Sequence, residues 1–362
     1  MTADVSFRLN GETVSVPAEG SLLDAVRDRL GDTSVKDGCS PQGQCGACTV
    51  LVNGEARVSC VTSITRVANA DVTTVEGLDP ATRDQWVAAF ESTGAAQCGF
   101  CTPGILCRLV STAARRGLSD VAIERALAAH LCRCTGWQPI VEAATLLRDG
   151  GEFAPRDPHL AAVRAGIEQG VPQAAGPDVV PGRAPYADDT APLDAQLWWT
   201  NGTGEYVAAR SRHEARQLTR AVQGRNSSAP VRPALPIPPG DWAVSLQTTF
   251  CEPAYVEPDT SWCEPGGEPS SPAANAGAFG AKRRSVIRDD AHRIANETGQ
   301  TVIVAWSREA VVRKGKNATW VSAEITGEQG LGLAANFVFM GPVTSALTIH
   351  GLAPPSDLIP VD

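Results

Sequence analysis

The stretch KDGCSPQGQCGACTV, residues 36–50, places three cysteines and three glycines within fifteen positions. Disulfides, a zinc ion and an iron–sulfur cluster are the arrangements that gather thiols so closely in a protein. Two more cysteine-rich stretches follow, QCGFCTPG at 97–104 and LCRCTGW at 131–137. The choice among these arrangements therefore decides both the fold and the function of this part of the chain.

The cysteine count argues against disulfides. The chain of 362 residues has eleven cysteines, an odd number, and nine of them lie between Cys39 and Cys134. The N-terminal stretch MTADVSFRLNGETVS has neither the basic start nor the apolar core of a signal peptide, so a cytoplasmic location is expected. Clustered thiols in a reducing compartment more often hold metal.

Charge and hydropathy exclude two classes of partner. The formal net charge is −9, and there is no basic block of the kind that binds nucleic acid. No apolar run approaches the ~18 residues that a membrane-spanning helix needs. We therefore expect no nucleic-acid partner and no membrane span.

The cysteines fall into two sets of four by their spacing. The first set has the spacing C-x5-C-x2-C-x11-C and comprises Cys39, Cys45, Cys48 and Cys60. The second set has a C-x2-C and a C-x-C thirty residues apart and comprises Cys98, Cys101, Cys132 and Cys134. Zinc would use the same ligands, but this C-x-C with its long gap, and the glycine-rich first loop, are atypical of zinc sites. The spacing favours iron–sulfur clusters, and Cys107, Cys251 and Cys263 are expected to be ordinary buried thiols.

Glycine and helix signals accompany the cysteines. Gly43 and Gly46 would let backbone N–H groups approach the sulfur atoms of a cluster, which stabilises its negative charge. Cys101 stands just before a helix that Pro103 opens, so its thiolate would lie in the positive field of a helix N-terminus.

A small α+β domain is expected over residues 1–76. Asn-Gly turns at 10–11 and 53–54 predict one hairpin on each side of the first cysteine loop. A helix is expected over 21–31, where Ser21 and Asp24 have the spacing of a capping box. Residues 77–151 instead predict a four-helix domain, with helices at 82–94, 102–117, 119–131 and 138–151.

The remaining chain changes composition. Seventeen of the 26 prolines lie between Pro155 and Pro272, which excludes long helices and central strands from much of this region. We expect a linker over 152–181 and a mixed α/β segment over 182–362. Regular structure is predicted in that segment at 213–223, 285–299 and 301–306.

The three motifs GCSPQGQCGACTV, QCGFCTPG and LCRCTG, in this order, resemble the iron–sulfur subunit of the molybdenum hydroxylases, the xanthine dehydrogenase and aldehyde oxidoreductase family. The likeness covers about residues 4–150. It implies a β-grasp, ferredoxin-like domain and a four-helix domain, each holding one [2Fe–2S] cluster on its set of cysteines. The first gap here is five residues, whereas the family usually has four; Pro41 and Gly43 can shape the larger loop.

The resemblance also implies a function. Such subunits relay electrons from a molybdopterin site in a large subunit, through two [2Fe–2S] clusters, to an FAD-binding subunit or another acceptor. It implies that the second set faces the molybdenum partner, and that Gln97 and Cys134 contact the pterin. His130 and Arg133 are expected to be surface or packing residues. The alternative is a free-standing two-cluster ferredoxin or redox sensor.

The second half resembles an abridged molybdenum-binding subunit in three segments, 182–197, 250–265 and 275–310. Ala278 and Ala281 stand where the family favours glycine, and no stretch matches the family's catalytic glutamate region. We therefore expect a structural or docking role and no catalytic residue in this chain. Three acids in this half are expected to be solvated: Glu252, Glu257 and Glu264.

Overall fold

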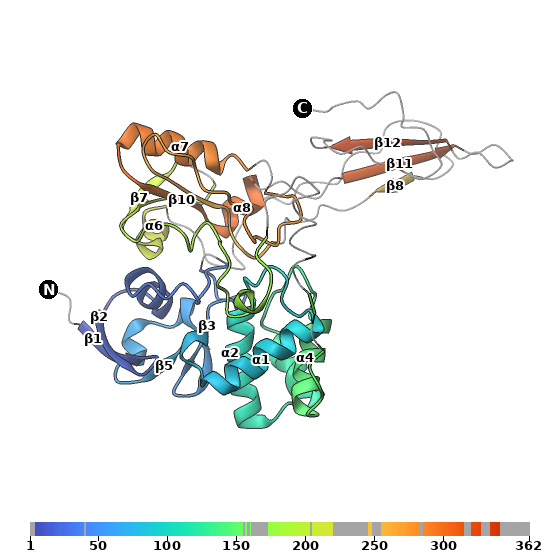
Figure 1. The fold of residues 1–362 in the computed structure, drawn as a ribbon. Helices are drawn as coiled ribbons and strands as arrows, with labels where there is room; N and C mark the ends of the chain where they lie inside the picture. Colours follow the sequence, from blue (N-terminus) through green and yellow to red (C-terminus); the bar gives the residue numbers. More distant parts are fainter. Residues whose placement is uncertain are drawn as a thin grey trace. The chain divides into compact units, whose positions relative to one another are not determined.

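The computed structural model describes residues 4–39, 41–154, 156–157, 160, 173–202, 205–219, 245–247, 255–282, 285–314, 320–326 and 334–340. The chain divides into a larger unit, 1–227 with 254–315, and a smaller one, 228–253 with 316–362. Strands and helices both contribute, as expected for a mixed α and β protein (Figure 1). Among the described residues, no helix is long and apolar enough to cross a membrane.

A five-stranded sheet opens the larger unit. Its strands are β1 (Asp4–Leu9), β2 (Glu12–Pro17), β3 (Thr49–Val52), β4 (Glu55–Val58) and β5 (Asp71–Thr73). The spatial order is β2-β1-β5-β3-β4, because the short β5 pairs in parallel with β1 and antiparallel with β3. Both predicted Asn-Gly turns are present: Asn10 and Asn53 have φ of 50° and 51°, as the hairpin turn requires.

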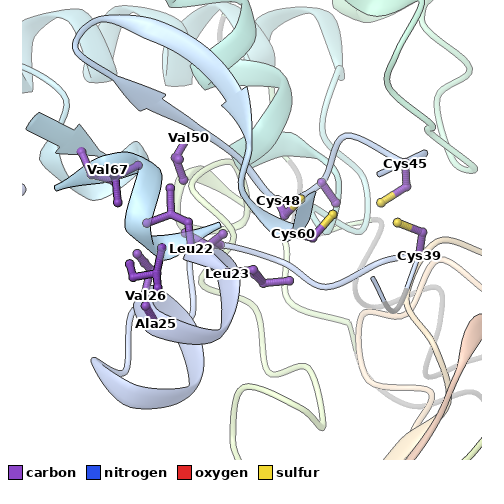
Figure 2. Close-up of a cluster of buried hydrophobic side chains, with 14 of the residues drawn as sticks. Leu22, Leu23, Ala25, Val26, Cys39, Cys45, Cys48, Val50, Cys60 and Val67 are labelled. Carbon is purple, nitrogen blue, oxygen red and sulfur yellow. The ribbon is translucent and has the colours of Figure 1, made fainter. Parts of the chain in front are cut away.

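The predicted helix over 21–31 forms with a wider winding than an α-helix. It is a π-helix, η1 (Asp24–Arg29), and the predicted capping box is present. The amide of Ser21 donates to Asp24 Oδ2 at 2.7 Å, and the amide of Asp24 donates to Ser21 Oγ at 3.2 Å. Its apolar face is buried against Val50 and Val67 beside the first cysteine set (Figure 2).

Four helices follow: α1 (Pro80–Thr93), α2 (Thr102–Arg116), α3 (Asp120–Leu127) and α4 (Gln138–Arg148). Helices α1 and α4 lie side by side, and α2 packs against β3 (Figure 1). The side chain of Ser119 caps α3, as predicted. However, α3 ends at Leu127 and not at 131, because the chain turns there and buries His130.

A second sheet, within the same larger unit, has the order β7-β6-β10-β9. Its strands are β6 (Gln196–Thr200), β7 (Val207–Ala209), β9 (Thr260–Cys263) and β10 (Val302–Trp306). The helices of this part are α6 (Arg212–Leu218), α7 (Ile287–Thr298) and α8 (Arg308–Lys314). The sequence predicted α7 and β10. It predicted a helix over 213–223, whereas α6 ends at Leu218 with Thr219 as its C-cap; residues 220–223 lie outside the described residues.

Buried ion pairs join residues 1–151 to the later part of the larger unit, which begins at about residue 182. Arg27 of η1 lies 2.7 Å from Asp188 and 2.6 Å from Asp189, and all three side chains are at least nine-tenths buried. Lys36 pairs with Asp189, and Arg212 of α6 pairs with Asp188. Residues just beyond the predicted linker are therefore part of the structure that supports the first cysteine loop.

The smaller unit contains an antiparallel sheet with the order β12-β11-β8. Its strands are β8 (Ser245–Gln247), β11 (Trp320–Thr326) and β12 (Ala334–Met340). Cys251 and Glu252 lie outside the described residues.

Candidate metal centres

The first cysteine set is assembled by one hairpin and one loop. Cys48 precedes β3 and Cys60 follows β4, so the β3–β4 hairpin brings them together, and the amide of Ser59 donates to Cys48 O at 3.2 Å. Cys39 and Cys45 come from the glycine-rich loop before β3. Figure 2 shows the four sulfur atoms turned toward one region, with Cys39 beside Cys45 and Cys48 beside Cys60. All four residues are buried, between 1% and 6% exposed.

Hydrogen bonds favour negative charge on this set. The thiols of Cys45 and Cys60 donate to Cys39 and lower the pKa of its thiol to about 2, with further help from the amides of Gln44 and Cys45. The amide of Gln42 also lies 3.0 Å from Cys39 Sγ. The same thiol contact, together with burial, raises the pKa of Cys45. Amide donors around a group of thiols are what a negatively charged cluster needs.

The second cysteine set lies at the helix boundaries. Cys98 and Cys101 precede α2, whereas Cys132 and Cys134 lie in the segment between α3 and α4. The thiol of Cys101 donates to Cys132 and lowers the pKa of Cys132 to about 5; the thiol of Cys98 likewise contacts Cys134. The amide of Thr135 donates to Cys132 Sγ at 3.4 Å.

Both sets thus offer contacting pairs of thiols. A zinc ion takes its four ligands around one point, whereas a [2Fe–2S] cluster divides four cysteines between two irons. Each set has four cysteines and amide donors beside its sulfur atoms, which fits the two-iron group.

The two sets share a tightly packed boundary. The amide of Leu131 donates to Cys45 O at 2.9 Å, and His130 is fully buried beside it, as a packing residue. A Cβ on Gly46 would lie 2.5 Å from His130 Cδ2, and a Cβ on Gly104 would lie 2.3 Å from Gly46 O. Gly46, which has φ of +74°, is therefore required for contact between the loops as well as for its backbone conformation.

Residues of the second half form one wall of the second set. The hydroxyl of Tyr186 donates to Cys98 O. A Cβ on Gly277 would lie 2.8 Å from Cys134 Sγ and 2.9 Å from Cys98 Sγ. The guanidinium of Arg133 lies 5.3 Å from the centre of the Phe279 ring. Neither Tyr186 nor Gly277 was singled out from the sequence, because only the fold brings them to the cysteines.

The remaining residues named from the sequence have mixed outcomes. Gln97 is exposed next to the second set, and Cys134 is half-buried. Cys107 and Cys263 are buried thiols outside both sets, as predicted. Ala278 and Ala281 are partly buried and pack against the core of the second sheet.

The expectation for Glu257 was wrong. Glu264 is exposed, but Glu257 is only 1% exposed. Its Oε2 accepts a hydrogen bond from Lys282 Nζ at 2.9 Å, and this lysine also donates to Pro258 O at 3.0 Å. A carboxylate can be buried where a cation meets it, and the sequence did not reveal that partner, which lies 25 positions away.

Comparison with known proteins agrees with this geometry. Residues 7–72 match the family described as 2Fe-2S iron-sulfur cluster binding domain, and residues 74–145 match the family described as [2Fe-2S] binding domain. Each match contains one complete set of four cysteines.

Among curated proteins, the chain is 42% identical over 137 residues to aldehyde oxidoreductase from Megalodesulfovibrio gigas, covering 36% of this chain and 15% of that protein. It is 38% identical over 145 residues to the xanthine dehydrogenase iron-sulfur-binding subunit of Escherichia coli O157:H7, covering 39% of this chain and 91% of that subunit.

The fold is also similar to a solved structure of aldehyde oxidoreductase from Desulfovibrio desulfuricans. The TM-score is 0.67 at 19% identity, over 94% of this chain and 54% of the other. Because the match covers 94% of this chain, the similarity in fold extends into the second half. The cysteine sets, the two matched domains and the near-complete match to a dedicated subunit lead to one conclusion: the chain belongs to the [2Fe–2S] iron–sulfur subunits of the xanthine dehydrogenase and aldehyde oxidoreductase family.

Proposed function

We propose that this chain is the electron-transfer component of a molybdenum-containing hydroxylase or dehydrogenase. It would relay electrons from a molybdopterin site in a partner chain to a flavin partner or another acceptor. A [2Fe–2S] cluster supplies one-electron redox chemistry when it is bound. The observation that carries the proposal is the pair of four-cysteine sets, one per matched domain, joined by the hydrogen bond from Leu131 to Cys45.

Each set would hold one cluster. The first would use Cys39, Cys45, Cys48 and Cys60, and the second Cys98, Cys101, Cys132 and Cys134. The buried position of the first set would exclude water, and its amide donors would stabilise added negative charge. The second set is more exposed, which suits electron exchange with a partner.

The proposed domains follow the sequence prediction. Residues 1–76 would be the β-grasp, ferredoxin-like domain and 77–151 the four-helix [2Fe–2S] domain. A linker at 152–181 would lead to the molybdenum-subunit-like segment at 182–362. The buried ion pairs of Arg27 with Asp188 and Asp189 support a structural role for the beginning of that segment.

The molybdenum partner would dock beside the second set. Gln97 is exposed there, and Cys134 is half-buried, so both are accessible for the proposed pterin contact. Leu131, Trp137 and Phe279 are 52%, 39% and 63% exposed near these cysteines, and exposed apolar side chains often mark a protein interface. An FAD-binding subunit would receive the electrons. We propose a cytoplasmic location for the complex, as the sequence predicts.

The test is metal analysis of the complex isolated from its own host through this chain. We expect ~4 iron atoms per chain, molybdenum in the complex, and two rhombic EPR signals after reduction. Cys48→Ser and Cys132→Ser should each remove one of the two signals, whereas the buried Cys107→Ser should remove neither. Iron without molybdenum would favour a free-standing ferredoxin, and zinc in place of iron would overturn the proposal.

A further inference from the structure

A cavity of about 390 Å³ lies between the β3–β4 hairpin and helices α2 and α3, and none of the cysteines lines it. Four arginines contribute to its wall: Arg108, Arg115, Arg116 and Arg125. Glu55 is the only acidic residue in that wall. The cavity therefore has an excess of positive charge in a chain whose net charge is −9.

The two helices build this wall by their periodicity. Arg108 and Arg115 are seven positions apart on α2 and so lie on the same face of the helix. Arg125 comes from α3 and faces the same space. The hydroxyl of Ser111 donates to Gly54 O at 2.9 Å and accepts from the amide of Ala56 at 3.2 Å. These bonds fix the hairpin against α2, so the cavity is preformed.

The arginines are poorly neutralised within the chain. Glu55 is 2.6 Å from Arg115, but it is also 3.0 Å from Arg57, which lies outside the cavity. Among the described residues, no carboxylate forms an ion pair with Arg108, Arg116 or Arg125. The Nε of Arg108 is buried without any hydrogen-bond partner. Because that atom is closed to solvent, it offers no donor to a ligand, and the other nitrogens of the four guanidinium groups would have to bind it.

We propose that this cavity binds the phosphate group of a small anion, either inorganic phosphate or a nucleotide. Guanidinium groups donate paired hydrogen bonds to phosphate oxygens, and the arginines that line the cavity would supply them. Cavities that bind small ligands generally have volumes of ~300 Å³ or more, so the volume of this cavity suits a small ligand. An acidic peptide of a partner protein would instead need an extended surface.

The experiment is calorimetric titration of the purified full chain with inorganic phosphate, AMP and ADP at constant ionic strength. We expect saturable binding with one site per chain. Arg108→Gln and Arg125→Gln should each weaken it by about tenfold or more, the value of one or two charge-assisted hydrogen bonds. Arg125 is exposed, so its variant should fold even if the Arg108 variant is unstable. Arg66→Gln removes an exposed arginine outside the cavity and should leave the affinity within about twofold.

The titrations also identify the ligand. Equal affinities for phosphate, AMP and ADP would assign the site to inorganic phosphate, whereas tighter binding of AMP or ADP would assign it to a nucleotide. Either result supports a phosphate site. The proposal is overturned if none of the three binds saturably, or if Arg66→Gln weakens binding as much as Arg125→Gln.

Discussion

The backbone amide of Leu131 donates a hydrogen bond of 2.9 Å to the carbonyl oxygen of Cys45. Cys45 belongs to the first cysteine set, and Leu131 directly precedes Cys132 of the second. One hydrogen bond therefore links the peptide segments that carry the two sets. Its position explains why α3 ends early: the chain must leave the helix after Leu127 for Leu131 to reach Cys45.

Replacing Leu131 with proline should separate these segments. Proline has no amide hydrogen, so the Cys45 carbonyl would lose its partner, and the free energy of unfolding should fall by about 1–3 kcal/mol. Leu131→Ala keeps the amide, and since the side chain is 52% exposed, it should change stability little. Denaturant unfolding of both variants measures the difference. If both variants lost the same free energy of unfolding, the side chain of Leu131, and not its amide, would be responsible for the stabilisation.

Gly277→Ala should disturb the second set selectively. The new Cβ would lie 2.8 Å from Cys134 Sγ, and the residue has φ of +57°. We expect loss of one of the two EPR signals and of about half the iron, because only one cluster depends on these cysteines. Gly280→Ala is the matched control: its φ is +88°, but its Cβ meets nothing within 4 Å. If both variants lose the signal, backbone strain is the cause, and contact with the cysteine is not.

Asp188→Asn should lower the free energy of unfolding, because Asp188 belongs to the buried ion pairs that join residues 1–151 to the segment beginning at about residue 182. The substitution leaves the buried Arg27 and Arg212 with less compensating charge, and breaking a buried ion pair typically costs about 3–5 kcal/mol. The control is Asp178→Asn, because Asp178 is 77% exposed and lies 3.4 Å from Arg183. Its effect on thermal unfolding should be small. A similar loss of stability in both variants would contradict the structural role of the buried network.

Stability should depend on pH through Glu257. Burial raises the pKa of its carboxyl from 4.5 to about 7, although Lys282 opposes the shift; Asp189 and Asp188 add to it. Between pH 4.5 and about pH 7, Glu257 is protonated in the folded state but has released its proton in the unfolded state. Raising the pH from 4.5 to 7 should therefore reduce the contribution of Glu257 to the free energy of unfolding.

Unfolding curves across this pH range measure that slope. Glu257→Gln cannot ionise, so the slope should be shallower than in the unsubstituted chain. Glu264→Gln, at an exposed position, should keep the original slope. Three identical slopes would mean that Glu257 does not titrate in this range.

Local signals predicted the first half of the fold well. Asn10 and Asn53 each precede a glycine and form the turns of the two hairpins, and Ser119 caps α3. Such features depend on neighbouring residues, so the sequence reveals them directly. The three-residue β5 was missed, because it is stable only between β1 and β3, and neither lies next to it in the sequence.

The sequence predicted the two sets of cysteines that lie in the matched domains, but it did not predict what surrounds them. The spacing of the cysteines identified two sets, since ligands on one loop must be close in sequence. The contact of Gly277 with Cys134 spans more than 140 positions, and the pair of Arg27 with Asp188 spans 161. Contacts at such separations arise from tertiary packing, which no local pattern encodes. Glu257 was mispredicted for the same reason.

The contact of Gly104 with Gly46 has a consequence for protein engineering. A Cβ at position 104 would lie 2.3 Å from one carbonyl oxygen and 2.7 Å from the next, that of Ala47. The loop that carries Gly46 and Ala47 therefore fits against a stretch of the α2 backbone that has no side chain at position 104. Moving residues 1–76 into another scaffold would require a helix with glycine at the matching position. Residues 1–76 and 77–151 can therefore be transferred only together.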